Sequence, residues 1–191
     1  STKGVWSRDD ARRGICQLGI EIQFLAHLGE SPPVSPAKNA PVPNGRHLAE
    51  YMPLTKAEEE LRRACREGGF AVIGNGTRPE TAPDGDDRIR AAVLRVFCLG
   101  LAPDALVHEH GIQLVGAWID GDLDLSGCDL PRPILVAHSV VDGDAVLRNA
   151  IAKQLIFNGS RFRAITADGL DCRGDVFLRN GFVAVREVRL L

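Results

Sequence analysis

The chain has 191 residues, a formal net charge of −2 at pH 7, and a composition that is 45% hydrophobic but only 5% aromatic. This length suits one domain, or a small domain beside a repeat array. The near-neutral charge predicts neither a nucleic-acid binder acting by bulk charge nor an acidic mimic of nucleic acid, and the few aromatic residues disfavour a large aromatic-lined ligand pocket.

The first predicted element is an amphipathic helix over residues 8–29, within an amino-terminal segment 1–30. Its apolar residues recur at helical spacing, at Ile15, Leu18, Ile22 and Leu25. A proline-rich linker is predicted over residues 31–50, because five prolines fall between Ser31 and Gly45 and prevent a helix or a central strand.

A helical cap is predicted over residues 51–110. Leu54-Thr-Lys-Ala-Glu58 has the pattern of a capping box at the start of a helix over 55–67. A second helix is predicted over 88–99, because its apolar residues follow helical spacing and Gly100 can end it. We expect this helix pair to cover the amino-terminal end of the repeat array that follows.

A short phrase recurs through residues 111–191. It reads Ile119-Asp-Gly-Asp-Leu-Asp-Leu125, Val141-Asp-Gly-Asp-Ala-Val-Leu147, Cys172-Arg-Gly-Asp-Val-Phe-Leu178 and, in a degraded form, Val185-Arg-Glu-Val-Arg-Leu190. The glycines at positions 121, 143 and 174 are 22 and 31 residues apart, or two and three units of about ten residues. A fixed period is typical of stacked repeats, in which each unit buries its apolar side against its neighbours.

A second periodicity has a step of five residues. Nine of the ten positions reached from Leu125 are apolar: Leu125, Leu130, Leu135, Val140, Ala145, Ala150, Leu155, Ile165 and Leu170, with Ser160 as the exception. Both periods predict a mainly β protein with a β-solenoid over 111–191, either truncated or continuing, because Leu191 falls inside a repeat. A sandwich or small barrel of short strands is the alternative.

The step of five residues resembles pentapeptide-repeat proteins, and the resemblance implies a right-handed β-solenoid with about 20–22 residues per turn. Residues 53–191 more closely resemble a group of uncharacterised bacterial repeat proteins often labelled membrane-associated oxidoreductases. The phrases that carry this resemblance include Leu54-Thr-Lys-Ala-Glu58, Ile89-Arg-Ala-Ala-Val-Leu-Arg95 and Gly111-Ile-Gln-Leu-Val-Gly-Ala-Trp-Ile-Asp-Gly-Asp-Leu-Asp-Leu125. The resemblance implies a membrane and a redox reaction, but it assigns no catalytic residue.

The histidines offer one candidate metal site. His108 and His110 would point the same way on a strand, and His138 could approach them in the repeat register. A polar connector is the alternative interpretation. The repeated aspartates could bind calcium, or they could cap backbone amides at turn corners; they are Asp120, Asp122, Asp124, Asp142 and Asp144.

Six late arginines are the candidate partner-binding residues, because solenoid spacing could align several of them in one anion-attracting strip. They are Arg161, Arg163, Arg173, Arg179, Arg186 and Arg189. The five cysteines share no CxxC spacing, which favours a reducing compartment over a disulfide framework or a structural zinc site. No apolar run reaches the length of about eighteen residues expected of a spanning helix. We therefore expect a cytoplasmic protein, with peripheral membrane contact left open.

Three functions remain open from the sequence. The first is a non-enzymatic protein-interaction or scaffold module, which binds a protein partner through a solenoid face or self-associates through an open carboxyl-terminal end. The second is an enzyme, either the labelled oxidoreductase or a metal-dependent hydrolase, although no cofactor motif and no catalytic set is evident. The third is pentapeptide-repeat-like contact with DNA or a DNA-binding enzyme.

Overall fold

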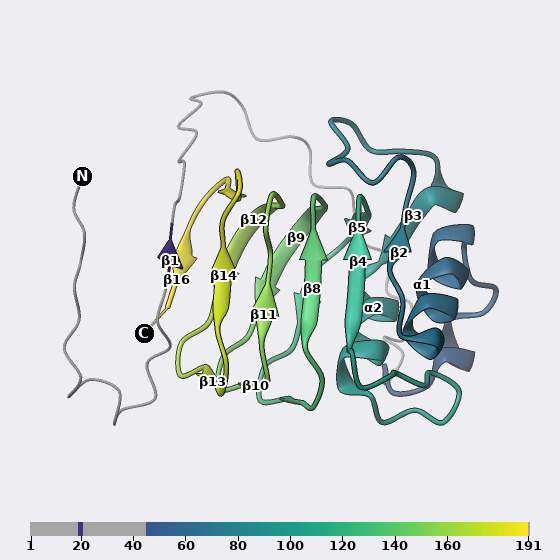
Figure 1. Ribbon diagram of the computed structural model, residues 1–191, viewed down its shortest axis with the longest axis horizontal. Helices are drawn as coiled ribbons and strands as arrows, with labels where there is room; N and C mark the ends of the chain where they lie inside the picture. Colours follow the sequence, from purple (N-terminus) through teal and green to yellow (C-terminus); the bar gives the residue numbers. More distant parts are fainter. Residues whose placement is uncertain (1–18, 21–44, 191) are drawn as a thin grey trace, which may run out of the picture.

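The fold is a parallel β-solenoid of about four coils, with two helices at its amino-terminal end (Figure 1). The structure is a computed structural model, and it describes Gly19, Ile20 and residues 45–190. The mainly β solenoid predicted from the repeats is confirmed.

Three parallel sheets form the sides of the solenoid. The six-stranded sheet has the order β1-β14-β11-β8-β4-β2, with bounds Gly19–Ile20, Val176–Leu178, Leu155–Ile156, Ile134–Ala137, Ile112–Val115 and Ala71–Val72. The three-stranded sheet has the order β13-β10-β7, with bounds Asp171–Cys172, Ile151–Ala152 and Asp129–Leu130. The seven-stranded sheet has the order β15-β12-β9-β5-β3, with bounds Val183–Ala184, Arg161–Thr166, Val140–Val146, Trp118–Asp120 and Arg88–Arg90. Its remaining strands are β16 (Val188–Arg189), which pairs with β12, and β6 (Leu123–Asp124), which pairs with β9.

Strand register fixes the length of a coil. Ile112, Ile134, Leu155 and Val176 occupy equivalent positions on successive coils, so the coils there are 22, 21 and 21 residues long. Gly121 and Gly143 also occupy equivalent corners, because their flanking strands pair in register, Ile119 with Val141 and Leu123 with Ala145. This confirms that the first two repeated phrases lie on adjacent coils.

The third phrase is not in register with the other two. Gly174 contacts the backbone of Lys153, at a different side of the solenoid. Its separation of 31 residues from Gly143 therefore corresponds to about one and a half coils. A half-coil repeat places similar turns on opposite sides of the stack, and the sequence alone does not distinguish the two sides.

The core is a set of side-chain ladders parallel to the solenoid axis. One ladder is buried throughout, with exposures of 0 or 1%, and its members are Ile89, Ile119, Val141, Phe162 and Ala184. Leu135 departs from the predicted step of five: it is only half-buried, while its neighbours Ile134 and Val136 are buried. Coils of unequal length shift the inward positions, so a fixed step of five fails at this strand.

Helix α1 (Lys56–Glu67) begins and ends as the sequence predicts. The Thr55 hydroxyl accepts a hydrogen bond from the Glu58 amide at 3.1 Å, and the Glu58 carboxylate accepts one from the Thr55 amide at 3.0 Å. Gly68 ends the helix with a φ of 73°, a left-handed conformation that glycine adopts without strain.

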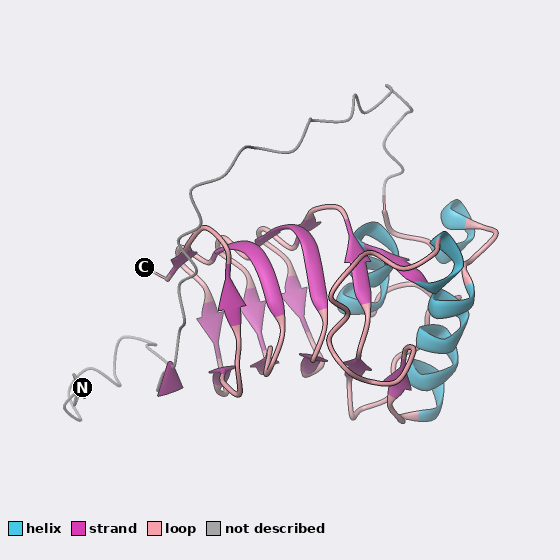
Figure 2. Ribbon diagram, turned by 90° about the horizontal axis from the view of Figure 1, so that it is seen from above, coloured by secondary structure: helices cyan, strands magenta, loops and turns pink. Residues whose placement is uncertain are grey.

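Helix α2 (Ala91–Leu99) begins three residues later than predicted. Arg88–Arg90 instead forms β3, which pairs with β5. These residues form a strand and not the first turn of the helix, because the strand completes the seven-stranded sheet and buries Ile89. Both helices lie against the first strands of the stack, as expected of a cap (Figure 2).

The predicted amino-terminal helix over residues 8–29 falls outside the described residues except at Gly19 and Ile20. Those two residues form β1, which pairs in parallel with β14 at the carboxyl-terminal end of the stack. Most of the predicted linker over 31–50 is also outside the described part, and its last residues lead into a 3₁₀ helix over Leu48–Tyr51.

Candidate interaction surfaces

The Asp-Gly-Asp corners are bound to each other and to an arginine on the next coil. Asp122 accepts a hydrogen bond from the Asp144 amide at 2.8 Å. The Arg163 guanidinium contacts Asp144 at 2.7 Å and Asp122 at 2.9 Å. Its hydrogen bond to Asp144 raises the pKa of Arg163, so the guanidinium stays charged. Asp122, and Asp124 through the Ser126 amide at 2.9 Å, therefore cap backbone amides at corners, which was one of the two interpretations of the sequence.

The six candidate arginines do not form one strip. Arg161, Arg163, Arg186 and Arg189 belong to the seven-stranded sheet and its connections. Arg173 follows β13 of the three-stranded sheet, and Arg179 follows β14 of the six-stranded sheet, where its guanidinium lies 4.5 Å from the centre of the Phe177 ring. The structure therefore keeps four of the six together.

The three candidate metal-binding histidines are divided between two ends of the parallel strands. The rings of His108 and His110 pack edge to face with their centroids 4.4 Å apart, and His110 Nδ1 lies 3.0 Å from the Gly68 carbonyl oxygen. His110 precedes β4, whereas His138 follows the opposite end of β8, the strand paired with β4. Over residues 45–190 and the Gly19–Ile20 strand, no group of three or more His, Cys, Asp or Glu side chains could hold a metal ion.

A shallow groove of about 580 Å³ runs along the three-stranded sheet. It crosses three successive coils, and its lining includes Asp129, Ile151, Lys153, Gln154 and Arg173. Ile151, Lys153 and Arg173 are exposed, and Ile151 is 36% exposed although it is apolar. The groove thus combines an apolar contact with two positive charges and the carboxylate of Asp129.

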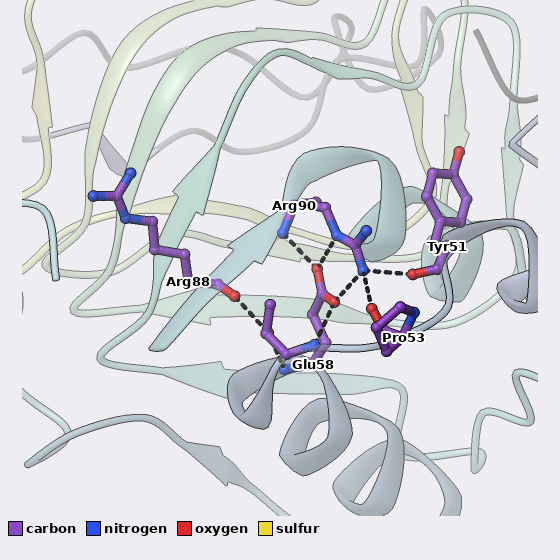
Figure 3. Close-up of polar contacts among 6 residues, drawn as sticks. Tyr51, Pro53, Glu58, Arg88 and Arg90 are labelled. Carbon is purple, nitrogen blue, oxygen red and sulfur yellow. Dashed lines mark hydrogen bonds and ion pairs between the residues drawn. The ribbon is translucent and has the colours of Figure 1, made fainter. Parts of the chain in front are cut away.

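The buried carboxylate of Glu58 in helix α1 binds Arg90 of β3, the first strand of the seven-stranded sheet. Glu58 is fully buried, and its carboxylate oxygens accept hydrogen bonds from the Arg90 side chain at 2.6 and 2.8 Å (Figure 3). The same guanidinium donates to the Tyr51 carbonyl at 2.7 Å. Burial raises the pKa of Glu58, but the hydrogen bonds from Arg90 and from the Thr55 amide outweigh it and hold the pKa below its ordinary value. The capping box indicated Glu58, whereas nothing in the sequence indicated Arg90 as its partner.

Two further polar connections were not predicted. Arg78 donates hydrogen bonds to the carbonyl oxygens of Gly159 at 3.0 Å and Gly181 at 2.9 Å, and thereby ties a loop of the cap to the last coils. Ser139 and Ser160 are buried inside the solenoid, where the Ser160 hydroxyl accepts from the Ser139 amide at 3.1 Å and donates to Val136 at 2.8 Å. Both sets satisfy backbone groups at coil corners.

The buried thiols have low reactivity. Burial raises the pKa of Cys65 to about 12, and it also raises the pKa of Cys98, so neither thiol forms a nucleophilic thiolate near neutral pH. Among the cysteines that the structure describes, none is in a disulfide. Cys16 lies outside the described residues.

Comparison with protein-family models, with curated proteins and with solved structures found no match. The pentapeptide-repeat and oxidoreductase resemblances therefore gain no support from these comparisons. Within the described residues, no helix has the length and apolar character needed to cross a membrane.

Proposed function

We propose that the protein is a non-enzymatic interaction module, whose solenoid binds an extended acidic segment of a partner protein in the groove along the three-stranded sheet. The observation that carries the proposal is the stacking of Lys153 and Arg173 on adjacent coils in this groove. Both residues lie on a face of the solenoid that runs parallel to its axis and that each successive coil continues.

The register places the two cations side by side. Ala152 pairs with Cys172. The backbones of the residues that follow them, Lys153 and Arg173, are therefore about 4.8 Å apart, which is the spacing between neighbouring strands. Like charges directly opposite each other on neighbouring strands are destabilising. In the described part of the chain, no ion pair joins either side chain to a carboxylate. An anionic group between them would therefore relieve this repulsion.

The shape of the groove favours an extended segment over a small molecule. Small-molecule sites enclose most of the surface of their ligand, whereas this groove is shallow and spans several coils. Ile151 offers an apolar contact two residues before Lys153, with Asp129 and Asp171 paired to it on the adjacent strands. The anionic groups of the segment therefore belong beside Lys153 and Arg173, two register positions beyond these aspartates.

The test uses a labelled synthetic peptide of alternating Glu and Val residues as the probe, with fluorescence anisotropy as the readout. A peptide of alternating Lys and Val is the matched control. We expect the acidic peptide to bind, and the double variant Lys153→Glu, Arg173→Glu to weaken binding at least about tenfold, or about 1.4 kcal/mol. The same charge reversal at Arg161 and Arg186, on another side of the solenoid, should leave peptide binding unchanged. Equal binding of both peptides, or equal affinity of both double variants, would contradict the proposal.

A further inference from the structure

The outer face of the seven-stranded sheet is divided into an acidic half and a basic half. The acidic half lies on β5, β9 and their connections and comprises Asp120, Asp122, Asp124, Asp142 and Asp144. The basic half lies on β12, β16 and the segment before β16, and it comprises Arg161, Arg163, Arg186 and Arg189; Glu187 lies among them, and Asp168 follows β12. The boundary runs between β9 and β12, which pair directly.

Part of this charge is neutralised within the chain. Arg163 bridges Asp122 and Asp144 across the boundary, and Arg189 pairs with Asp168 at 2.9 Å. Asp120 and Asp142 on the acidic half, and Arg161 and Arg186 on the basic half, are exposed. Among residues 45–190, none of these four side chains takes part in an ion pair.

Two arginines lie at the amino-terminal side of this face. Arg90, level with Asp120 in the register, pairs with Glu58, and Arg88 donates to the Pro83 carbonyl at 2.7 Å and keeps its positive charge. From β5 onward in the described part of this face, the exposed charges without an ion pair are negative on β5, β6 and β9 and positive on β12 and the segment before β16, with Glu187 as the exception.

We infer that this face binds a second copy of the chain in a two-fold dimer. A face with one acidic and one basic half is complementary to itself when the partner is reversed along the solenoid axis. In an isologous contact each copy contributes the same patch, so the acidic half of one copy lies opposite the basic half of the other.

The charge pattern also selects the orientation of the two-fold axis. The axis of a face-to-face dimer lies in the plane of the interface. An axis parallel to the solenoid would place the acidic halves against each other, and such like-charge contacts are unfavourable. An axis parallel to the strands, at the boundary between β9 and β12, reverses the coil order and places β9 opposite the partner's β12.

The dimer should be sensitive to salt and concentration, because exposed ion pairs contribute only about 0–1 kcal/mol each and are screened by ions. Sedimentation velocity of the wild-type chain measures it directly. We expect self-association at about 50 mM NaCl that weakens at least about tenfold at about 500 mM NaCl, where the screening length falls to a few ångströms. A chain that stays monomeric at low salt and at concentrations of about 500 µM would overturn the inference.

Charge-swap variants identify the face. The double variants Arg161→Glu, Arg186→Glu and Asp120→Lys, Asp142→Lys should each be monomeric alone, because each places like charges opposite one another. Their equimolar mixture should form a heterodimer, because the first variant then offers an acidic face and the second a basic one. A mixture that remains monomeric, or single variants that still dimerise, would refute the proposed contact.

The control is the variant Lys153→Glu, Arg173→Glu, which makes the same change in net charge on the three-stranded sheet and should still dimerise. The inference does not depend on the proposed peptide groove. The groove variant tests peptide binding, and the variants on the seven-stranded sheet test dimerisation. Circular dichroism of every variant checks that these exposed substitutions leave the fold intact.

Discussion

Gly143 shows how closely the coils approach at the Asp-Gly-Asp corner. A Cβ placed on Gly143 would lie 2.2 Å from the carbonyl oxygen of Gly121 and 2.5 Å from the Asp122 amide nitrogen. These are backbone atoms of the adjacent coil, which cannot rotate away as a side chain can. Gly143 therefore allows close packing of the two coils, and Asp122 and Asp144 carry polar contacts between coils.

We predict that Gly143→Ala destabilises the protein by about 2–3 kcal/mol, because the added methyl group must push two coils apart. Urea denaturation followed by circular dichroism measures the free energy of unfolding. Gly85→Ala is the matched control, since no atom lies within 4 Å of its added Cβ, and we expect it to change stability by less than about 0.5 kcal/mol. Equal stability of the two variants would show that the coils are not packed as described.

At the scale of elements, the contact between α1 and β3 includes an ion pair between the fully buried Glu58 and the partly exposed Arg90. Helix α1 presents Glu58 to the backbone of Thr55 and to the side chain of Arg90 at once. The Thr55 hydroxyl also donates to the Arg88 carbonyl at 2.7 Å. The cap is thereby held to the first strand of the seven-stranded sheet by polar contacts as well as by apolar packing.

We predict that Glu58→Ala destabilises the protein by about 2 kcal/mol, because it removes the ion pair with Arg90 and leaves the backbone amides of Thr55 and Arg90 without their acceptor. Glu59→Ala is the control: Glu59 forms an exposed pair with Arg62 at 3.5 Å, and such pairs contribute about 0–1 kcal/mol. Urea denaturation of both variants at neutral pH distinguishes them, and similar losses would contradict a special role for Glu58.

The same pair predicts a pH dependence of stability. The folded-state pKa of Glu58 is lower than its ordinary value of 4.5, so the carboxylate stabilises the fold fully above pH 4.5 and progressively less as the pH falls through the folded-state pKa. Glu58→Gln lacks this titration. The difference in unfolding free energy between wild type and Glu58→Gln should therefore be constant near neutral pH and shrink below about pH 4.5. A difference that grows on acidification would contradict the assignment.

The strength of the local patterns explains which elements were predictable. The capping box and Gly68 fixed both ends of α1 because their chemistry is contained within a few residues. Residues 88–90 were assigned to a helix because their local spacing is helical, yet they pair with a strand thirty residues away in sequence. Sheet completion is a long-range effect, and helical periodicity does not report it.

The interaction surfaces were less predictable than the fold, because a single sequence does not determine which outward positions share a side. The six arginines are close in sequence but lie on all three sheets, since coils of 21 and 22 residues place residues half a coil apart on opposite sides. Two features of the outer faces emerged only with the register. They are the stacking of Lys153 on Arg173 and the sign change between β9 and β12.

At the scale of the whole molecule, the strands of each coil pair only with those of adjacent coils, while the side chains of Arg78 and Arg163 reach further along the stack. The strands follow sequence order along the stack, from β4 through β8 and β11 to β14 in one sheet and from β5 through β9 and β12 to β15 in another. In such an array, stability is approximately a sum of unit stabilities and of the interfaces between adjacent units. Removing a whole coil should therefore leave the remaining register intact.

We predict that deleting residues 140–160 yields a folded protein with one coil fewer. Val140 and Arg161 occupy equivalent positions, so Arg161 would follow Ser139 in the same register and β12 would pair with β5. Circular dichroism should retain the β signal. The urea m-value and the free energy of unfolding should both fall, because less surface is buried and one interface is lost. Deleting only residues 140–149 is the control: it removes about half a coil, places outward residues inside, and should abolish cooperative unfolding. If both deletions unfold, or if both fold, the coils are not interchangeable units.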